Sequence, residues 1–424
     1  MAGETLSVLD GLLKDVYQDI ITEQVGTFSA VQQSFEKITD AQWEGRYAIE
    51  GTVMSLNEGV GAIGEDANLP TAGYFDPQQF KIPMKYVYGS FQMTKPMMAA
   101  AETSKGAFKN ATRYSMESMV RNLKRERARM LWGAGTGILA YTNTSGAVTT
   151  LAVDTPGGVT GTLGARYLRK NMIIACINPG DGTLRSGTVT TISGIAATGL
   201  SATIPSTTIT ENDYVVRANT ATETAAAGTS YNKEPMGILG LIDNATYLET
   251  LHNLSRTTYP QLKSRVHSSV GALTLDAIQT NFDIASQQGD AEISSLAAHH
   301  SVRRAYLALL EADRRYSGGD LKAPDGGTKV VKRGSYVTFG DVPIIEDKYA
   351  PYGMIFGIDK NHMKRYVNIE GEWANESGAI LRQVSGKDTW TAFYRIFENY
   401  HCSRPNTCFR MDGVTATAVY VADY

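Results

Sequence analysis

The chain has 424 residues, 42% of them apolar, which is enough for two or three compact units with sizeable cores. Its 40 basic and 43 acidic side chains leave a net charge of −3, which argues against a protein that grips nucleic acid through a basic excess. Three cysteines are too few for a disulfide framework, and no signal peptide or membrane-length apolar run is visible, so folding in a cytoplasm is expected.

The N-terminal residues have the pattern of an amphipathic helix at 7–23. Ser7 fits an N-cap, and apolar residues recur at spacings of three and four, namely Leu9, Leu13, Val16 and Ile20. The stretch that follows promises no core of its own. We therefore expect residues 1–45 to form an arm that packs on something else.

Residues 46–93 predict a long two-stranded β-hairpin. A strand at 46–56 is followed by a Gly-, Asp- and Pro-containing tip at 58–79 and then by a second alternating stretch. That stretch places five apolar side chains on one face: Phe80, Ile82, Met84, Tyr86 and Tyr88. Because such a ribbon is at best marginally stable alone in water, these side chains are expected to become buried only when a neighbouring molecule covers them.

Three glycines in the tip, Gly59, Gly61 and Gly64, match the dinucleotide-binding pattern G-x-G-x-x-G. That site needs a helix whose N-terminus faces the pyrophosphate. Here Glu65 and Asp66 follow instead, which places acids where phosphate would lie. The pattern therefore predicts a flexible hairpin tip and no cofactor.

Residues 100–132 predict one long helix of about 45 Å at 1.5 Å per residue, ending at Gly133. Its apolar stripe includes Phe108, Met116, Met119 and Leu123. Four basic residues are expected on or near the wet side: Arg121, Lys124, Arg125 and Arg129. Glutamates are mixed among them, so this side is interpreted as facing solvent or another subunit rather than DNA.

Residues 138–232 change to short β-type runs rich in Thr, Gly and Ser, which predicts a small inserted barrel or sandwich. Helices are expected next at 274–288 and 300–316. Strands are expected from 336 to 400, with a last strand at 414–421.

Few residues suggest chemistry. His401, Cys402 and Cys408 lie close in sequence, but a zinc site needs about four ligands and no second cysteine pair is present. No nucleophile, phosphate-binding or acid/base motif stands out. The sequence therefore predicts no catalytic residue, no metal site and no enzyme activity.

The order of these parts resembles the major capsid protein of tailed double-stranded-DNA bacteriophages, whose fold is shared with encapsulins and the herpesvirus capsid floor. Three segments carry the likeness: LWGAGTG at 131–137 after the long helix, PMGILGL at 235–241 and FGDVPII at 339–345. The resemblance implies an α+β fold with a small β-barrel-like insertion. Its parts would be an N-terminal arm (1–45), an extended β-hairpin loop (46–96), a spine helix (97–137), the axial-domain entry with the inserted β subdomain (138–234), an axial domain (235–335), peripheral-domain strands (336–402) and a C-terminal strand returning to the axial domain (403–424).

The same resemblance implies a structural protein that assembles with itself into hexamers and pentamers of an icosahedral virion shell. The extended loop would contact the neighbouring subunit. A separate scaffolding protein, a portal, a cement protein and non-specifically contacted packaged DNA would be the further partners. Lys81 and Lys85 lie where some relatives crosslink, but no crosslink is predicted. Two alternatives remain at this point: an encapsulin-like compartment shell, and a soluble enzyme with an inserted β domain.

Overall fold

The computed structural model describes residues 30–39, 43–44, 46–66, 68–95, 105–185, 187–317, 337–375 and 380–416. The predicted helix at 7–23 and most of the predicted strand at 414–421 lie outside these residues. The end of the predicted arm is described, and it packs on its own chain. Val31 and Phe35 are buried in the main core, and a short strand, β1 (Glu36–Ile38), pairs with β20.

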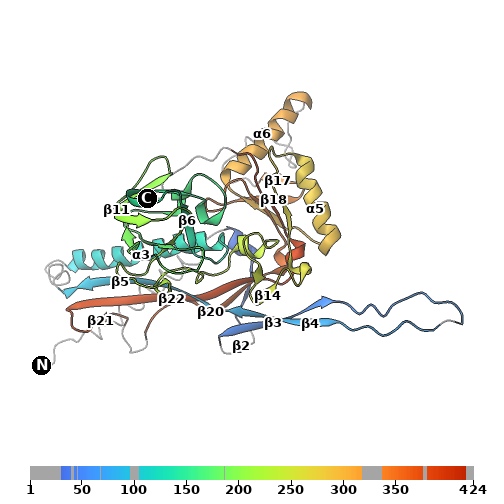
Figure 1. The fold of residues 1–424 in the computed structure, drawn as a ribbon, viewed down its shortest axis with the longest axis horizontal. Helices are drawn as coiled ribbons and strands as arrows, with labels where there is room; N and C mark the ends of the chain where they lie inside the picture. Colours follow the sequence, from blue (N-terminus) through green and yellow to red (C-terminus); the bar gives the residue numbers. More distant parts are fainter. Residues whose placement is uncertain are drawn as a thin grey trace.

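The long helix α3 (Lys105–Leu131) packs on an elongated five-stranded sheet at the base of the molecule (Figure 1). Strand β22 (Thr389–Cys402) is at the centre of this sheet and pairs antiparallel with β5 (Lys85–Thr94), β20 (Met363–Trp373) and β21 (Arg382–Gln383). Apolar side chains of α3, β5, β20 and β22 form one of the cores. The predicted long helix is confirmed over its described length.

A second, smaller sheet is the hairpin, built from β2 (Trp43–Glu44), β3 (Tyr47–Ser55) and β4 (Asp76–Pro83). Tyr47 pairs with Pro83, and Ser55 pairs with Asp76 at the far end. Beyond that pair the chain runs on as a long irregular loop that projects from the body of the molecule (Figure 1).

The chain changes both its partner and its phase at Met84. Up to that residue the even-numbered side chains, Phe80 and Ile82, are buried; from Val87 on, the odd-numbered ones are. The strand leaves β3 at this point and pairs with β22 instead. Because side chains alternate between faces with a period of two, a shift by one residue reverses which of them point to the core.

A six-stranded sheet carries the helices α5 (Leu275–Gly289) and α6 (His300–Ser317), which confirms both predicted helices (Figure 1). Thr274 caps α5 by accepting a hydrogen bond from the Ala277 N–H. The strand order is β15-β23-β19-β16-β18-β17. Their bounds are β15 (Arg265–His267), β16 (Ser295–Ala298), β17 (Val337–Phe339), β18 (Val342–Glu346), β19 (Ile355–Ile358) and β23 (Phe409–Met411).

This sheet corrects one predicted boundary. Residues 336–402 were expected to form one set of strands beside the long helix, but β17, β18 and β19 belong to the sheet of α5 and α6. Only β20, β21 and β22 lie with α3. The reason is a non-local pairing: β18 lies parallel to β16, with α6 in the connection between them.

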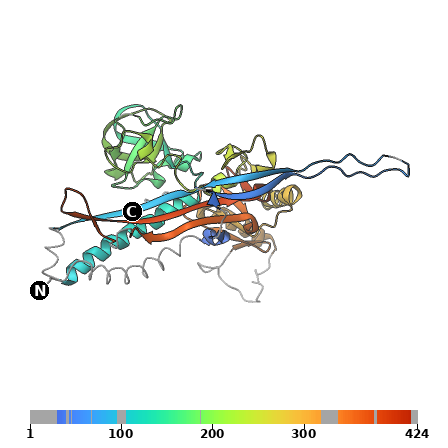
Figure 2. The same ribbon diagram turned by 90° about the horizontal axis from the view of Figure 1, so that it is seen from below.

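The predicted β insertion is a seven-stranded antiparallel sheet in the order β10-β11-β7-β6-β12-β8-β9, which stands apart as a rounded unit (Figure 2). Its two ends meet at a narrow neck after α3. Gly137 has a positive φ of 75°, and its Cα lies so close to the Ser230 carbonyl that no Cβ fits. The bounds are β6 (Ile138–Thr142), β7 (Gly146–Asp154), β8 (Ile173–Ile177), β9 (Thr190–Thr191), β10 (Gly194–Ile195), β11 (Ser201–Ile209) and β12 (Tyr214–Arg217).

The return from this subdomain begins with the short helix α4 (Ile238–Leu241) and a two-stranded turn, β13 (Thr250–Leu251) and β14 (Leu254–Ser255). Gly237 lies directly against the last carbonyls of α3, where a side chain would collide with the Met130 oxygen. The turn that follows reaches the base of the hairpin, which makes it part of the candidate site.

Candidate assembly interface

We call the paired part of the hairpin nearest the body, residues 47–54 and 79–83, its root. The root is held by contacts with its own chain. Asn253, in the turn between β13 and β14, accepts a hydrogen bond from the Lys81 N–H at 2.7 Å and donates one to the Gln79 carbonyl at 2.9 Å. Gln261 donates a hydrogen bond to the carbonyl of Met54, on the neighbouring strand β3, at 3.1 Å. These side-chain amides satisfy backbone groups that an open strand edge would leave to water. These contacts therefore fix the direction of the hairpin as far out as Met54 and Gln79.

Two histidines lie under this root. The rings of His252 and His401 are 5.1 Å apart, and His401 packs edge-on against Phe80 at 4.5 Å. All four of their ring nitrogens are buried without a hydrogen-bond partner. Burial, reinforced by Lys364, lowers the pKa of His401 to about 3, and burial beside His401 lowers that of His252 well below 6.5. Both rings are therefore neutral at pH 7.

Glu50 ties β3 to the long sheet next to these rings. Its carboxylate accepts hydrogen bonds from Lys364 at 2.6 Å and from the Tyr366 hydroxyl, and lies 3.6 Å from His401 Nε2. Burial and the Glu50 carboxylate raise the pKa of Tyr366. Because the contact joins β3 to β20, it anchors the β3 side of the root to the long sheet.

Beyond the root, the hairpin tip is apolar and exposed. Among the described residues, most of the large apolar side chains with high exposure lie on this hairpin, and Val60 and Tyr74 are 88% and 84% exposed. We define the tip side chains as Leu56, Val60, Ile63, Leu69, Tyr74 and Phe75. A concentration of exposed apolar side chains on one thin projection is typical of an interaction surface.

The predicted contact face of the second strand needs correction. Phe80, Ile82 and Met84 are already buried within their own chain and are not left for a neighbouring molecule to cover. Phe80 and Ile82 belong to the main core, at 0% and 1% exposure. The predicted glycines Gly59, Gly61 and Gly64 do lie in the exposed loop, with no helix after them. The apolar part left to solvent thus lies farther out than predicted.

Tyr86 and Tyr88 differ from the other three predicted contact residues because they lie after the change of phase. They are 52% and 59% exposed on the face of β5 that points away from α3. Both rings pack edge-on around Phe397 of β22, at 4.7 and 5.8 Å. They form an aromatic patch with Phe393. Their role in contacts between copies stays a prediction.

The apolar stripe of the long helix is covered by its own chain. Met116 and Leu123 are buried against β5 and β22, and Met119 lies over Gly89 so closely that a Cβ there would be 2.5 Å from its sulfur. The stripe predicted from the sequence thus packs on a sheet of the same chain. The side chain of Phe108 lies outside the described residues.

The C-terminal half of α3 holds the β subdomain through buried charges. Glu126 lies 2.9 Å from Arg169 and 3.2 Å from Arg217 of the subdomain, and Arg129 pairs with Glu126 and Glu234. Burial alone would raise the pKa of Glu126, but the arginines outweigh it and lower it to about 2. Arg129 was predicted on the wet side and is instead buried, because the subdomain covers it.

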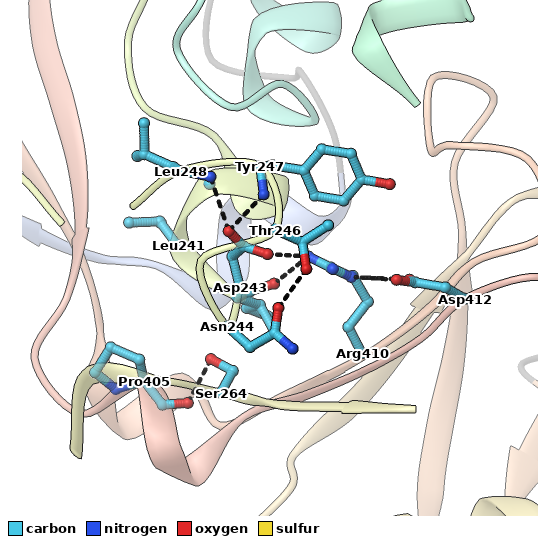
Figure 3. A network of polar contacts seen from close by, with 12 residues as sticks. Leu241, Asp243, Asn244, Thr246, Tyr247, Leu248, Ser264, Pro405, Arg410 and Asp412 are labelled. Atoms are coloured by element: carbon cyan, nitrogen blue, oxygen red, sulfur yellow. Dashed lines mark hydrogen bonds and ion pairs between the residues drawn. The ribbon is translucent and has the colours of Figure 1, made fainter. Parts of the chain in front are cut away.

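A second buried network fastens residues 243–248, which lead into the turn between β13 and β14, to the six-stranded sheet (Figure 3). Arg410 of β23 bonds to Asp243 at 3.0 Å and to Asp412 at 2.8 Å, while Asp243 accepts the N–H groups of Tyr247 and Leu248 at 2.9 Å. The segment that leads into the turn supporting the hairpin root is thus fixed to the six-stranded sheet. Sequence reasoning missed it, because charges scattered over 170 positions show no pattern before they meet.

The other candidate chemistry does not come together. Cys402 and Cys408 are buried free thiols that hydrogen-bond each other, whereas His401, one residue away on an extended strand, packs against Phe80. No group of three or more His, Cys, Asp or Glu side chains that could hold a metal occurs in the described ranges. Lys85 is half-buried and donates to the Asn232 carbonyl at 2.8 Å. None of the helices in the described part of the chain is long and apolar enough to cross a membrane.

Comparison with solved structures finds a phage capsid chain of similar fold. No protein-family model and no curated protein matches the sequence. A chain of the cyanophage A-1(L) capsid asymmetric unit has a TM-score of 0.55 at 9% identity, over 93% of each chain. The native GTA particle capsid gives 0.45 at 11% identity over 91% of this chain and 90% of that one. The holo-SrpI encapsulin complex from Synechococcus elongatus PCC 7942 gives 0.41 at 10% identity over 94% and 92%.

The likeness to the cyanophage capsid shows that this protein has the fold of a phage capsid chain. The predicted fold class is therefore confirmed. The likeness extends over nearly the whole chain.

Proposed function

We propose that this protein is the major capsid protein of a tailed double-stranded-DNA phage, a structural subunit that assembles with itself into an icosahedral shell of hexamers and pentamers. The observation that carries the proposal is the combination of a phage capsid fold over 93% of the chain with an exposed apolar hairpin tip. A tip of this kind has no role in a solitary globular protein, whereas it is the natural contact of a subunit that is completed by its neighbours.

The energetics of the tip suit a shell. Six large apolar side chains at ~1.5–3 kcal/mol each give roughly 9–18 kcal/mol of gross stabilisation when they become covered. Ordering the loop and the loss of subunit freedom offset much of this gain. Each contact is then weak enough to break and reform during assembly, while the sum over a closed shell is large.

The partners follow from the same proposal. Copies of the chain would be the main one, joined by a separate scaffolding protein, a portal and a cement protein, in a virion that encloses double-stranded DNA. The net charge of −3 supports non-specific contact with that DNA rather than tight binding, since packaged DNA has to stay mobile.

The test is to remove the tip and keep the root. Residues 56–75 are replaced by Asn-Gly, which joins the paired Ser55 and Asp76 with a two-residue hairpin turn. The variant should fold with the melting temperature of the parent, because the tip contributes nothing to the cores, but should stay monomeric under electron microscopy where the parent forms rings and shells. Normal shells from the variant would remove the hairpin from the assembly contact.

A further inference from the structure

Two of the three cysteines meet where the chain passes from one sheet to another. Cys402 is the last residue of β22 in the long sheet, and Cys408 directly precedes β23 in the six-stranded sheet. Both side chains are 0% exposed, and their thiols hydrogen-bond each other. The pair therefore spans the short link between the two sheets, residues 403–407.

This link folds back on itself, so that its two ends face each other. It contains a single helical turn, η7 (Pro405–Thr407), in which the Cys408 N–H donates to the Pro405 carbonyl at 3.1 Å and the Thr407 N–H donates to the Arg404 carbonyl at 3.1 Å. A disulfide requires two side chains that point at each other from nearby backbone positions. The turn meets this requirement, since the two thiols are already in hydrogen-bond contact.

The two thiols differ in acidity. The hydrogen bond from Cys402 lowers the pKa of Cys408, while the same hydrogen bond, together with burial, raises the pKa of Cys402. Because the thiolate is the reactive form of cysteine, Cys408 is the first nucleophile of the pair and Cys402 is the thiol that closes the bond. The third cysteine, Cys176 in β8, provides a contrast, because burial raises its pKa to about 12.

We propose that Cys402 and Cys408 are a redox pair, which is a dithiol when the chain is made and becomes a disulfide once the particle is exposed to an oxidising medium. The timing rests on the proposed function, since a virion leaves the reducing interior of the cell, where disulfides are rare. The pairing of the two thiols does not depend on it.

The oxidant in this step is a small-molecule disulfide, which enters when the turn opens locally beside the exposed Arg404. The Cys408 thiolate attacks one of its sulfurs, releases one small thiol and forms a mixed disulfide. Cys402 then loses its proton and attacks the Cys408 sulfur, which releases the second small thiol. The two protein thiols are oxidised to one disulfide, and the small disulfide is reduced to two thiols.

The new bond would fasten a link that is already attached on both sides. On the side of the long sheet, the Ser403 N–H donates to the His362 carbonyl at 3.0 Å. On the other side, the Ser264 hydroxyl donates to the Pro405 carbonyl at 2.7 Å. A covalent bond across the base of the turn keeps these contacts together and restricts the unfolded chain. The oxidised protein should therefore melt several degrees above the reduced protein.

The experiment follows the thiols of the full-length protein by alkylation and mass spectrometry. One sample is denatured in N-ethylmaleimide directly at cell lysis, and a second is first incubated with oxidised glutathione. Trypsin leaves both cysteines in one peptide, residues 396–410, because Pro405 follows Arg404. The first sample should give this peptide with two labels. The second should give it unlabelled and two hydrogen atoms lighter, while Cys176 is labelled in both.

The matched variants are Cys402→Ala, Cys408→Ala and the control Cys176→Ala. Each is compared with its own reduced form, so that a loss of packing from the substitution cancels. The rise in melting temperature on oxidation should persist in the control and disappear in the other two. A doubly labelled peptide after oxidation, a lasting mixed disulfide with glutathione, or an equal rise in all three variants overturns the redox pair. A disulfide that forms in a parent protein unable to assemble supports the pair and overturns the proposed function alone.

Discussion

The pair of neutral histidines under the hairpin root makes the stability of the fold depend on pH. In the unfolded chain a histidine takes up a proton below about pH 6.5. In the folded protein the pKa of His401 is lowered to about 3 by burial and by Lys364. The unfolded state therefore binds more protons between these two values, and stability is lost as the pH falls from about 6.5 toward 3.

The substitution His401→Phe tests this effect of pH. Neither ring nitrogen of His401 has a hydrogen-bond partner, so a phenyl ring loses no hydrogen bond and keeps the contact with Phe80. The fall in unfolding free energy between pH 7 and pH 5 should shrink by about 2 kcal/mol relative to the parent. Urea titrations at the two pH values measure it, and the value at pH 7 isolates any change in packing. An unchanged difference between the two pH values would mean that His401 is protonated in the folded state.

Little of this site could be predicted residue by residue. His401 was considered because Cys402 and Cys408 lie near it in sequence, but neighbouring residues on a strand face opposite ways and the three do not meet. Phe80 and Ile82 were correctly placed on one face, yet assigned to the wrong neighbour. The pattern of a strand shows which side is apolar, not whether the same chain or another one covers it.

At the scale of elements, the hairpin root depends on the side-chain amide of Asn253. Asn253→Ala removes the bonds to Lys81 and Gln79, and we expect the Lys81 amide hydrogen to exchange at least tenfold faster, which corresponds to a loss of about 1.4 kcal/mol at this site. Hydrogen exchange followed by mass spectrometry or NMR measures the change.

The matched control for this prediction is Asn253→Asp. An aspartate keeps the acceptor for the Lys81 N–H and loses only the donor to the Gln79 carbonyl, so protection at Lys81 should persist. Equal exchange rates in the alanine variant and the parent would show that the root is held without this residue.

Elements with strong local patterns were predictable. The helices α5 and α6 and the strand β22 lie close to their expected positions, because period and capping are read within the element itself. The change of phase at Met84 was not predictable. Tyr86 and Tyr88 continue the even-numbered apolar pattern, and a tyrosine suits either face of a strand. The change of pairing partner from β3 to β22 is therefore not visible in the local sequence.

At the scale of the whole molecule, the order of parts along the chain was enough to predict the fold class, since hairpin, long helix, β insertion and mixed sheets follow one another in the described residues. The assignment of β17, β18 and β19 failed because strand pairing across α6 is a long-range event. The direction of the hairpin was equally out of reach. It depends on Asn253 and Gln261, which are far in sequence from the hairpin strands that they contact.

Under the proposed function, this subunit is incomplete until copies of itself cover its hairpin. The most direct test is the mass distribution of the purified full-length protein, by mass photometry and negative-stain microscopy, over a series of protein concentrations. We expect a cooperative passage from monomers to rings and closed shells, with few species of intermediate size. A protein that stays monomeric or stops at a discrete dimer at every concentration, with the hairpin tip still exposed, would contradict it.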